Sequence, residues 1–117
     1  MRKKDLRTPD YLRHILDAIE RIRTYTEPLS HESFAATPMA VDAVVRNIEI
    51  IGEAAHNITQ GDPDFAAAHP EIPWEAMYGM RNQVSHGYFA VDIDIVWSTV
   101  QTYLPDLEHK PSKLKNT

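Results

Sequence analysis

The sequence predicts an all-α protein, a bundle of four long helices joined by short turns. Two observations support this class. Apolar residues recur every three or four positions along four separate segments, which is the spacing of one helix face. No segment offers a partner for a strand. With 117 residues, 43% of them apolar, the chain has the size and the apolar content of one domain with a normal core.

The first helix is expected to begin at Thr8-Pro9. Thr8 is a suitable N-cap, and proline fits the first helical position because its missing N–H would have no partner there. Asp17 and Arg21 are four residues apart on the solvated side, as in many exposed ion pairs. The apolar stripe of this helix consists of Leu12, Ile15, Leu16, Ile19 and Ile22.

A break at residues 28–30 follows, and residues 31–35 can form one short turn. The second long helix is expected from Pro38 to about Gln60, with Gly61 as the residue just beyond its end. Its core stripe consists of Val41, Val44, Val45, Ile48, Ile51, Ala55 and Ile58.

Residues 61–73 contain three prolines and are predicted to form a connecting loop. The third helix is expected from Trp74 to between Ser85 and Gly87. The fourth covers about residues 92–107. Its first residues alternate with period two, like a strand, but the later spacing is helical. The expected buried set of this helix is Ile93, Val96, Trp97, Val100 and Leu104.

Charge is distributed unevenly along the chain. The two ends, residues 1–7 and 110–117, are basic, whereas residues 8–109 carry 16 acidic residues against five basic ones, all of them Arg. This balance argues against a broad basic face for duplex DNA. The chain has no Cys and no apolar run long enough to span a membrane. The expected location is therefore the cytoplasm, with no membrane partner.

The third helix carries the most informative polar residue. Arg81 shares the face of the apolar residues Trp74, Met77, Tyr78 and Val84. Because a guanidinium stays charged and is costly to bury alone, Arg81 must either meet a carboxylate or point into an anion-binding cleft. His86 and Tyr88 follow around Gly87, where the helix is expected to end. A histidine at a helix C-terminus is favoured in its charged form.

A purely structural interpretation of these three residues is also open. Arg81 could form a structural ion pair, His86 could be a residue without a catalytic role at the C-terminal end of the helix, and Tyr88 could pack in the core.

The resemblance to a known family rests on residues 80–89, M-R-N-Q-V-S-H-G-Y-F, which are similar to the Arg-x4-His-x-Tyr signature of the HEPN superfamily, in its HepT-like branch. Further similar segments follow the same order, and the resemblance covers nearly the whole chain apart from the tails. They are D-Y-L-R-H-I-L-D-A-I (10–19), D-A-V-V-R-N-I-E-I-I-G-E-A-A (42–55), I-P-W (72–74) and V-D-I-D-I-V-W (91–97).

The resemblance implies a helical bundle that dimerises and acts as a metal-independent endoribonuclease, the toxin of a toxin–antitoxin pair. It implies Arg81 and His86 as catalytic residues and Tyr88 as the residue to which a minimal nucleotidyltransferase antitoxin attaches AMP. Asn82, next to Arg81, and Tyr88 are the candidate substrate-binding residues. No cofactor is expected.

Elementary chemistry is consistent with this implication. RNA cleavage without a metal needs a base for the 2′-hydroxyl, an acid for the leaving 5′-oxygen, and positive charge on the phosphorane. One motif supplies a single His86 and a single Arg81. A two-fold dimer with the motif near its axis would supply two of each.

A polar stripe runs along the second long helix. It can be a solvated face with ion pairs, or it can place Glu49 or Glu53 against Arg81 and so orient the guanidinium. Arg46 belongs to the same stripe. Its members are Asp42, Arg46, Glu49, Glu53, His56 and Gln60.

The spacing Glu53-x-x-His56 also occurs in di-iron bundles, but those sites need two such motifs and two further Glu residues. With one motif in the chain, no metal site is expected. The remaining histidines are expected at the surface or in loops: His14, His31, His69 and His109.

Two other classes of function compete with the nuclease. The chain could be a non-catalytic module that binds a nucleotide or a nucleotidyltransferase, which the acidic central part of the sequence favours because RNA would meet a repulsive field. It could also be a structural bundle that dimerises through its Trp, Met and Tyr face. RNA cleavage distinguishes the nuclease from the non-catalytic binding module.

Overall fold

The computed structural model describes residues 8–85 and 93–103, and every regular element within these ranges is helical. This confirms the predicted all-α class. Three helices are long, and the others are short. In chain order the elements are α1 (Thr8–Thr26), α2 (His31–Ala35), α3 (Pro38–Gly61), α4 (Pro63–Ala68), α5 (Trp74–Ser85), α6 (Ile93–Ser98) and the π-helical turn η2 (Thr99–Tyr103).

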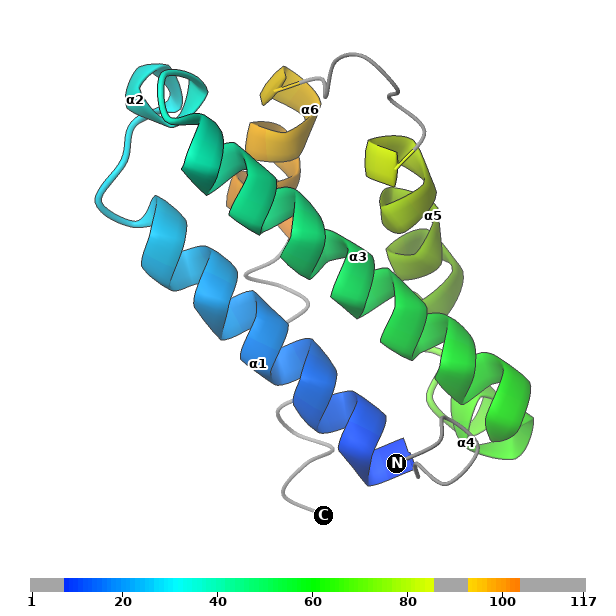
Figure 1. Cartoon of the computed structure of the whole chain (residues 1–117). Coiled ribbons are helices and arrows are strands. Elements are labelled where there is room, and N and C mark those ends of the chain that lie inside the picture. The colour runs from blue at the N-terminus through cyan, green and yellow to red at the C-terminus, as the bar shows by residue number, and fades with distance from the viewer. Residues whose placement is uncertain (1–7, 86–92, 104–117) are drawn as a thin grey trace.

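Helix α3 is the centre of the bundle. The two most extensive helix contacts are α1 with α3 and α3 with α5, and both pairs run antiparallel (Figure 1). Helix α6 packs against α2 and α3 at the end of the bundle where α1 turns into α3. Arg81 in α5 is thereby placed against the middle of α3.

The core is formed by the predicted helix stripes. Almost all of the stripe positions in α1 and α3 are buried, and only Leu16 and Val45 are half-buried. Each fully buried Ile, Leu or Met contributes roughly 1.5–3 kcal/mol of transfer free energy, so these stripes supply most of the packing. The fully buried side chains include Ile15, Ile19, Ile22, Ile48, Ile51 and Ile58.

The prediction of a loop over residues 61–73 was wrong in its first half, because α4 lies within it. Asp62 caps both helices. Its backbone N–H donates a hydrogen bond to the carbonyl of Ile58 at the end of α3. Its side-chain carboxylate accepts a hydrogen bond of 3.4 Å from the N–H of Phe65 at the start of α4. Pro63 takes the first helical position of α4. Gly61 is therefore the last residue of α3 rather than the residue beyond it, and its φ is not in the left-handed region.

Thr8 is the first described residue of α1, and its hydroxyl donates a hydrogen bond of 2.7 Å to Asp62 Oδ2. Arg21, expected to pair with Asp17, instead donates to Asn47 Oδ1 of α3 at 3.4 Å. Both polar side chains thus connect α1 to the chain that follows it.

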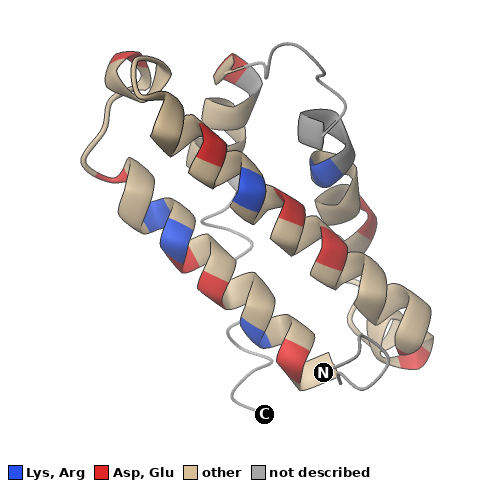
Figure 2. Cartoon of the chain, in the orientation of Figure 1, with Lys and Arg blue, Asp and Glu red and all other residues tan. Residues whose placement is uncertain are grey.

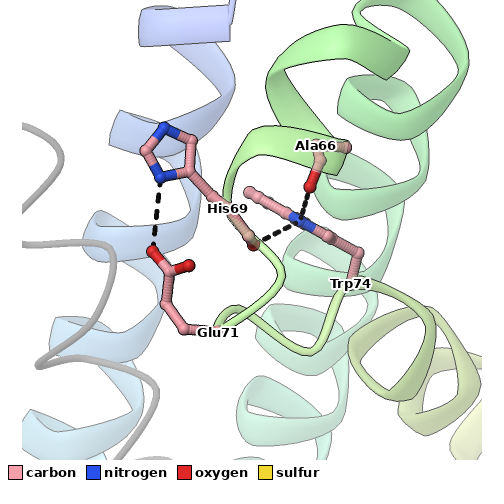
Figure 3. A network of polar contacts seen from close by, with 4 residues as sticks. All are labelled: Ala66, His69, Glu71 and Trp74. Atoms are coloured by element: carbon pink, nitrogen blue, oxygen red, sulfur yellow. Dashed lines mark hydrogen bonds and ion pairs between the residues drawn. The ribbon is translucent and has the colours of Figure 1, made fainter.

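The start of α5 is tied to α4 through Trp74. Its indole N–H lies within hydrogen-bond distance of the carbonyl oxygens of Ala66 at 3.1 Å and His69 at 3.2 Å, and His69 Nδ1 lies 3.3 Å from Glu71 Oε2 (Figure 3). The third helix begins at Trp74 as predicted and reaches Ser85. The link fixes where α5 starts and therefore where Arg81, two turns later, faces α3.

The fourth predicted helix is interrupted. It is α-helical from Ile93, as expected despite its period-two start, but changes to π-helical at Thr99. Val96 and Val100 are buried, and Ile93 and Trp97 are half-buried. The predicted end positions Asp92 and residues 104–107 lie outside the described residues.

Helix α6 contacts α2 through His31 and Phe34. His31 Nε2 lies 2.7 Å from Asp94 Oδ1, and its ring stacks on Trp97 with centroids 5.7 Å apart and planes 6° apart. Trp97 also contacts the fully buried Phe34, at 5.2 Å between ring centroids. We name these residues the α2–α6 clasp.

Along α1 acidic and basic positions are mixed, whereas along α3 Arg46 lies among the acidic positions Asp42, Glu49 and Glu53 (Figure 2). None of the described helices is long and apolar enough to cross a membrane.

Candidate active site around Arg81

Arg81 meets a carboxylate on the neighbouring helix. Its Nε lies 3.5 Å from Glu53 Oε2, with one third of the Arg81 side chain exposed. Glu53 is one of the two glutamates of the α3 stripe that were expected against Arg81. Glu49, one turn earlier, lies 3.9 Å from Arg46 Nη1.

Gly52 allows α3 and α5 to approach each other at this point. A Cβ atom at residue 52 would lie 3.0 Å from the carbonyl oxygen of Met77 and 3.3 Å from Arg81 Cγ, and it would overlap Arg81 Cβ. Any side chain here would push the two helices apart. Sequence reasoning missed Gly52, although glycine inside a helix costs about 1 kcal/mol relative to alanine and so signals a packing requirement.

Tyr78 contacts the Arg81 guanidinium from a second direction. Arg81 Cζ lies 5.7 Å from the centroid of the Tyr78 ring. That ring stacks on His56 of α3, with centroids 4.2 Å apart and planes 14° apart. The guanidinium is thus oriented by a carboxylate and by an aromatic face, and the second contact is worth about 0.5–1 kcal/mol at a partly exposed site.

Glu53 and His56, the two residues of the Glu-x-x-His spacing, both contact α5. Within residues 8–85 and 93–103, no group of three or more metal-binding side chains is close enough to hold a metal ion. The two ends of the α3 stripe, Asp42 and Gln60, are exposed. The polar stripe is therefore solvated at its two ends, whereas Glu53 in its middle contacts Arg81.

A cleft of about 500 Å³ opens beside Arg81, between α1, α3 and α5. Sequence reasoning missed its α1 side, because His14 gave no pattern beyond that of a surface residue. We name it the Arg81 cleft. Its lining residues are Tyr11, His14, Arg46, Glu49, Ile50, Glu53, Ala54, Asn57 and Arg81.

The rest of the predicted motif is only partly placed. Asn82 follows Arg81 in α5, and its side chain is not among those described. His86 comes directly after Ser85, the last residue of α5, and it lies outside the described residues together with Tyr88. The roles of Asn82, His86 and Tyr88 stay predictions.

A helical bundle with one oriented arginine beside a cleft, followed in sequence by His and Tyr at the Arg-x4-His-x-Tyr spacing, defines a HEPN-type domain. Residues 15–114 match the family model described as "Ribonuclease HepT-like". The chain belongs to the HepT-like ribonuclease family.

Several curated relatives are similar over most of their length. A protein of Thermococcus cleftensis named "Probable ribonuclease HepT" is 43% identical over 91% of this chain and 94% of its own. A candidate RNase of Caldanaerobacter subterraneus is 36% identical over 93% of this chain and 96% of its own. A Methanocaldococcus jannaschii protein, named as both a gamma-glutamylcyclotransferase and a candidate RNase, is 36% identical over 96% of this chain but 48% of its own. No solved structure matches.

Proposed function

We propose that this chain is a metal-independent endoribonuclease, the toxin of a toxin–antitoxin pair, working in the cytoplasm as a single domain. Family membership and the ribonuclease names of the relatives support an enzyme that acts on RNA. The observation that carries the proposal is the Arg81–Glu53 pair, which aims a permanent positive charge at an open cleft one turn before the end of α5.

In the proposed reaction, the 2′-oxygen of one ribose attacks the adjacent phosphorus and the bond from phosphorus to the 5′-oxygen breaks. One His86 accepts the proton of the 2′-hydroxyl, and a second His86 donates a proton to the leaving 5′-oxygen. Arg81 stabilises the charge of the phosphorane, a role that suits a guanidinium because it can donate two parallel hydrogen bonds. The products are a cyclic phosphate and a free 5′-hydroxyl.

The need for two histidines leads to a homodimer. A single chain carries one His86 in the motif, whereas a two-fold pair brings two copies to one axis. We therefore propose that the active form is a dimer with a shared site, to which Asn82 and Tyr88 contribute substrate contacts.

Inhibition would act through Tyr88. We propose that a minimal nucleotidyltransferase, the antitoxin, transfers AMP to this hydroxyl. The added phosphodiester is a bulky anion, and it would occupy the space and the positive charge that the RNA phosphate needs. No cofactor is assigned to the chain itself.

The first test is cleavage of a set of RNAs by the purified chain in EDTA, beside His86→Ala. We expect wild-type cleavage to survive the chelator and the variant to lose it. Loss of wild-type cleavage in EDTA would refute metal independence. Cleavage by His86→Ala at the wild-type rate would refute the assigned base and acid.

A variant that is monomeric in solution tests the shared site. We expect it to lose cleavage while keeping its helical content. Full activity in the monomer would show that each chain acts alone.

The antitoxin step is tested by mass. Co-expression with an active nucleotidyltransferase should add one or more AMP units to the wild-type chain and none to Tyr88→Phe. An unchanged wild-type mass would rule the modification out.

One observation favours a second function, a non-catalytic module that binds a nucleotide or a nucleotidyltransferase. Residues 8–109 hold 16 acidic residues against five basic ones, so RNA approaches a negative field. This function is supported if the unmodified dimer binds nucleotides but cleaves none of the RNAs.

A further inference from the structure

We propose that the Arg81 cleft is a base pocket. It would take the base of one nucleotide of single-stranded RNA, next to the phosphate that Arg81 contacts. Asn57 would read the edge of this base and His14 would cover its face. This inference rests on the proposed function and adds to it the determinant of sequence preference.

The position and size of the cleft suit one nucleotide. Arg81 lies on its α5 side, and the remaining lining comes from α1 and α3. Its volume of about 500 Å³ falls within the range of roughly 300–1,000 Å³ typical of small-ligand pockets. A phosphate at Arg81 would therefore leave space for the base attached to the same nucleotide.

The charges of the lining favour a base over a second phosphate. Two carboxylates, Glu49 and Glu53, lie beside two arginines, Arg46 and Arg81, so the charges balance. A second phosphate would be repelled by the carboxylates. A base is neutral, and its amino and imino groups donate to oxygen acceptors of this kind.

The rest of the lining combines aliphatic area with two polar side chains, Asn57 and His14. Ile50 and Ala54 supply aliphatic surface. In the part of the chain that the structure describes, neither the Asn57 amide nor the His14 ring forms a hydrogen bond or an ion pair with another residue. The amide can donate and accept at once, which matches the adjacent donor and acceptor on a base edge.

His14 lines the cleft from α1 and contacts Tyr11. Its ring lies edge-on to Tyr11, with centroids 5.9 Å apart and planes at 90°. Tyr11 is 7% exposed, so it supports His14 from the core while His14 itself stays exposed. An exposed ring beside an amide is the arrangement by which proteins stack and read unpaired RNA bases.

The test measures binding rather than cleavage. Four short RNAs that differ in one base, with 2′-O-methyl groups that remove the attacking hydroxyl, are titrated against the full chain by fluorescence anisotropy. We expect the wild type to prefer one base by about tenfold, as one good edge contact provides. Asn57→Ala should remove this preference. His14→Ala should lower the affinity for all four RNAs several-fold.

Gln60→Ala is the matched control, because Gln60 is an exposed amide one turn further along α3. It should keep both the affinity and the preference. Circular dichroism and the unfolding midpoint establish that each variant is folded. Should Asn57→Ala misfold, Asn57→Asp, which replaces the amide donor with a charged oxygen acceptor of similar shape, should change the preferred base and lower the affinity for all four RNAs.

The outcomes separate the pocket from the nuclease. Equal binding of the four RNAs by the wild type, or an unchanged preference in Asn57→Ala and Asn57→Asp, would overturn the base pocket while leaving cleavage possible. A preference that depends on Asn57 in a chain that never cleaves RNA would uphold the pocket and refute the nuclease. Binding of AMP alone, with none of the RNAs, would also overturn the RNA pocket.

Discussion

Gly52 of α3 and Arg81 of α5 are in direct contact, and the glycine leaves no space for a side chain beneath the arginine. The neighbouring residue Glu53 then pairs with the guanidinium at 3.5 Å. Two consecutive residues of α3 thus place Arg81, the first through its lack of a side chain and the second through its charge.

Gly52→Ala is expected to lower cleavage and stability together. Alanine is the better helix former by about 1 kcal/mol, but overpacking of a close contact typically costs 1–3 kcal/mol. The overlap is with backbone and Cβ atoms, which cannot turn away, so we expect a net loss of about 1 kcal/mol or more. Urea unfolding and cleavage rate measure the two effects.

Gly79→Ala is the control for this substitution, since Gly79 lies in α5 with open space around its Cα. It should stabilise the chain by up to about 1 kcal/mol and leave cleavage unchanged. A Gly52→Ala variant that is as stable and as active as Gly79→Ala would show that the helices separate there without consequence.

Glu53→Gln should slow cleavage with little effect on stability. Both partners of the pair are partly exposed, at 34% for Arg81 and 44% for Glu53, so the ion pair contributes less than about 1 kcal/mol to folding. We expect kcat to fall about tenfold, because the guanidinium loses an orienting contact, while KM changes less.

Glu49→Gln is the comparison variant, because it removes a carboxylate one turn earlier on α3 that lies 3.9 Å from Arg46 Nη1. It should retain most of the wild-type kcat. Equal losses of kcat in Glu53→Gln and Glu49→Gln would mean that cleavage depends on the negative charge of the cleft and not on the orientation of Arg81.

Asp62→Ala should destabilise the fold more than Thr8→Val. One Asp62 oxygen accepts from the N–H of Phe65 at the start of α4, and the other accepts from the Thr8 hydroxyl at 2.7 Å. Loss of a helix cap costs about 0.5–2 kcal/mol, and loss of the hydroxyl bond about 1 kcal/mol. Denaturant unfolding of the two single variants and the double variant gives the coupling free energy between Thr8 and Asp62. If the losses in unfolding free energy of the single variants simply add up in the double variant, the shared role of Asp62 is contradicted.

His31→Ala should loosen the α2–α6 clasp. The variant loses both the contact to Asp94 and the stacking on Trp97, and we expect a loss of about 1–2 kcal/mol. Asp94→Asn keeps an oxygen acceptor and the stacking, so its loss should be below about 0.5 kcal/mol. Near-UV circular dichroism of Trp97 should change in His31→Ala alone; equal unfolding midpoints for the two variants would argue that the stack contributes nothing.

The long helices could be predicted because their apolar spacing and first residues are local features. Pro38 begins α3 and Trp74 begins α5, as expected. Helix α4 was missed because three prolines suggested a loop, although Asp62-Pro63 is itself a cap followed by a suitable first residue. The change to a π-helix at Thr99 has no known local sequence signal.

The site could be predicted only in part, because its partners come from different helices. The charge of Arg81 required either a carboxylate or an anion-binding cleft, and Glu49 and Glu53 are one turn apart on the same face, so the sequence could not choose between them. The contact with Gly52 depends on how closely α3 and α5 approach. His14 joins the cleft through the packing of α1, which spacing within one helix does not reveal.

The central position of α3 also bears on the order in which the chain folds. Helices α1 and α5 both pack on α3, so neither can be fixed in its native place until part of α3 has formed. We expect the folding nucleus to contain the middle of α3. Kinetics of Ile48→Val in α3 should then show a larger φ-value than truncation of Met77 in α5, both of which are fully buried. On that ordering, Arg81 is brought to Glu53 late, and the candidate active site is assembled in the last stage of folding.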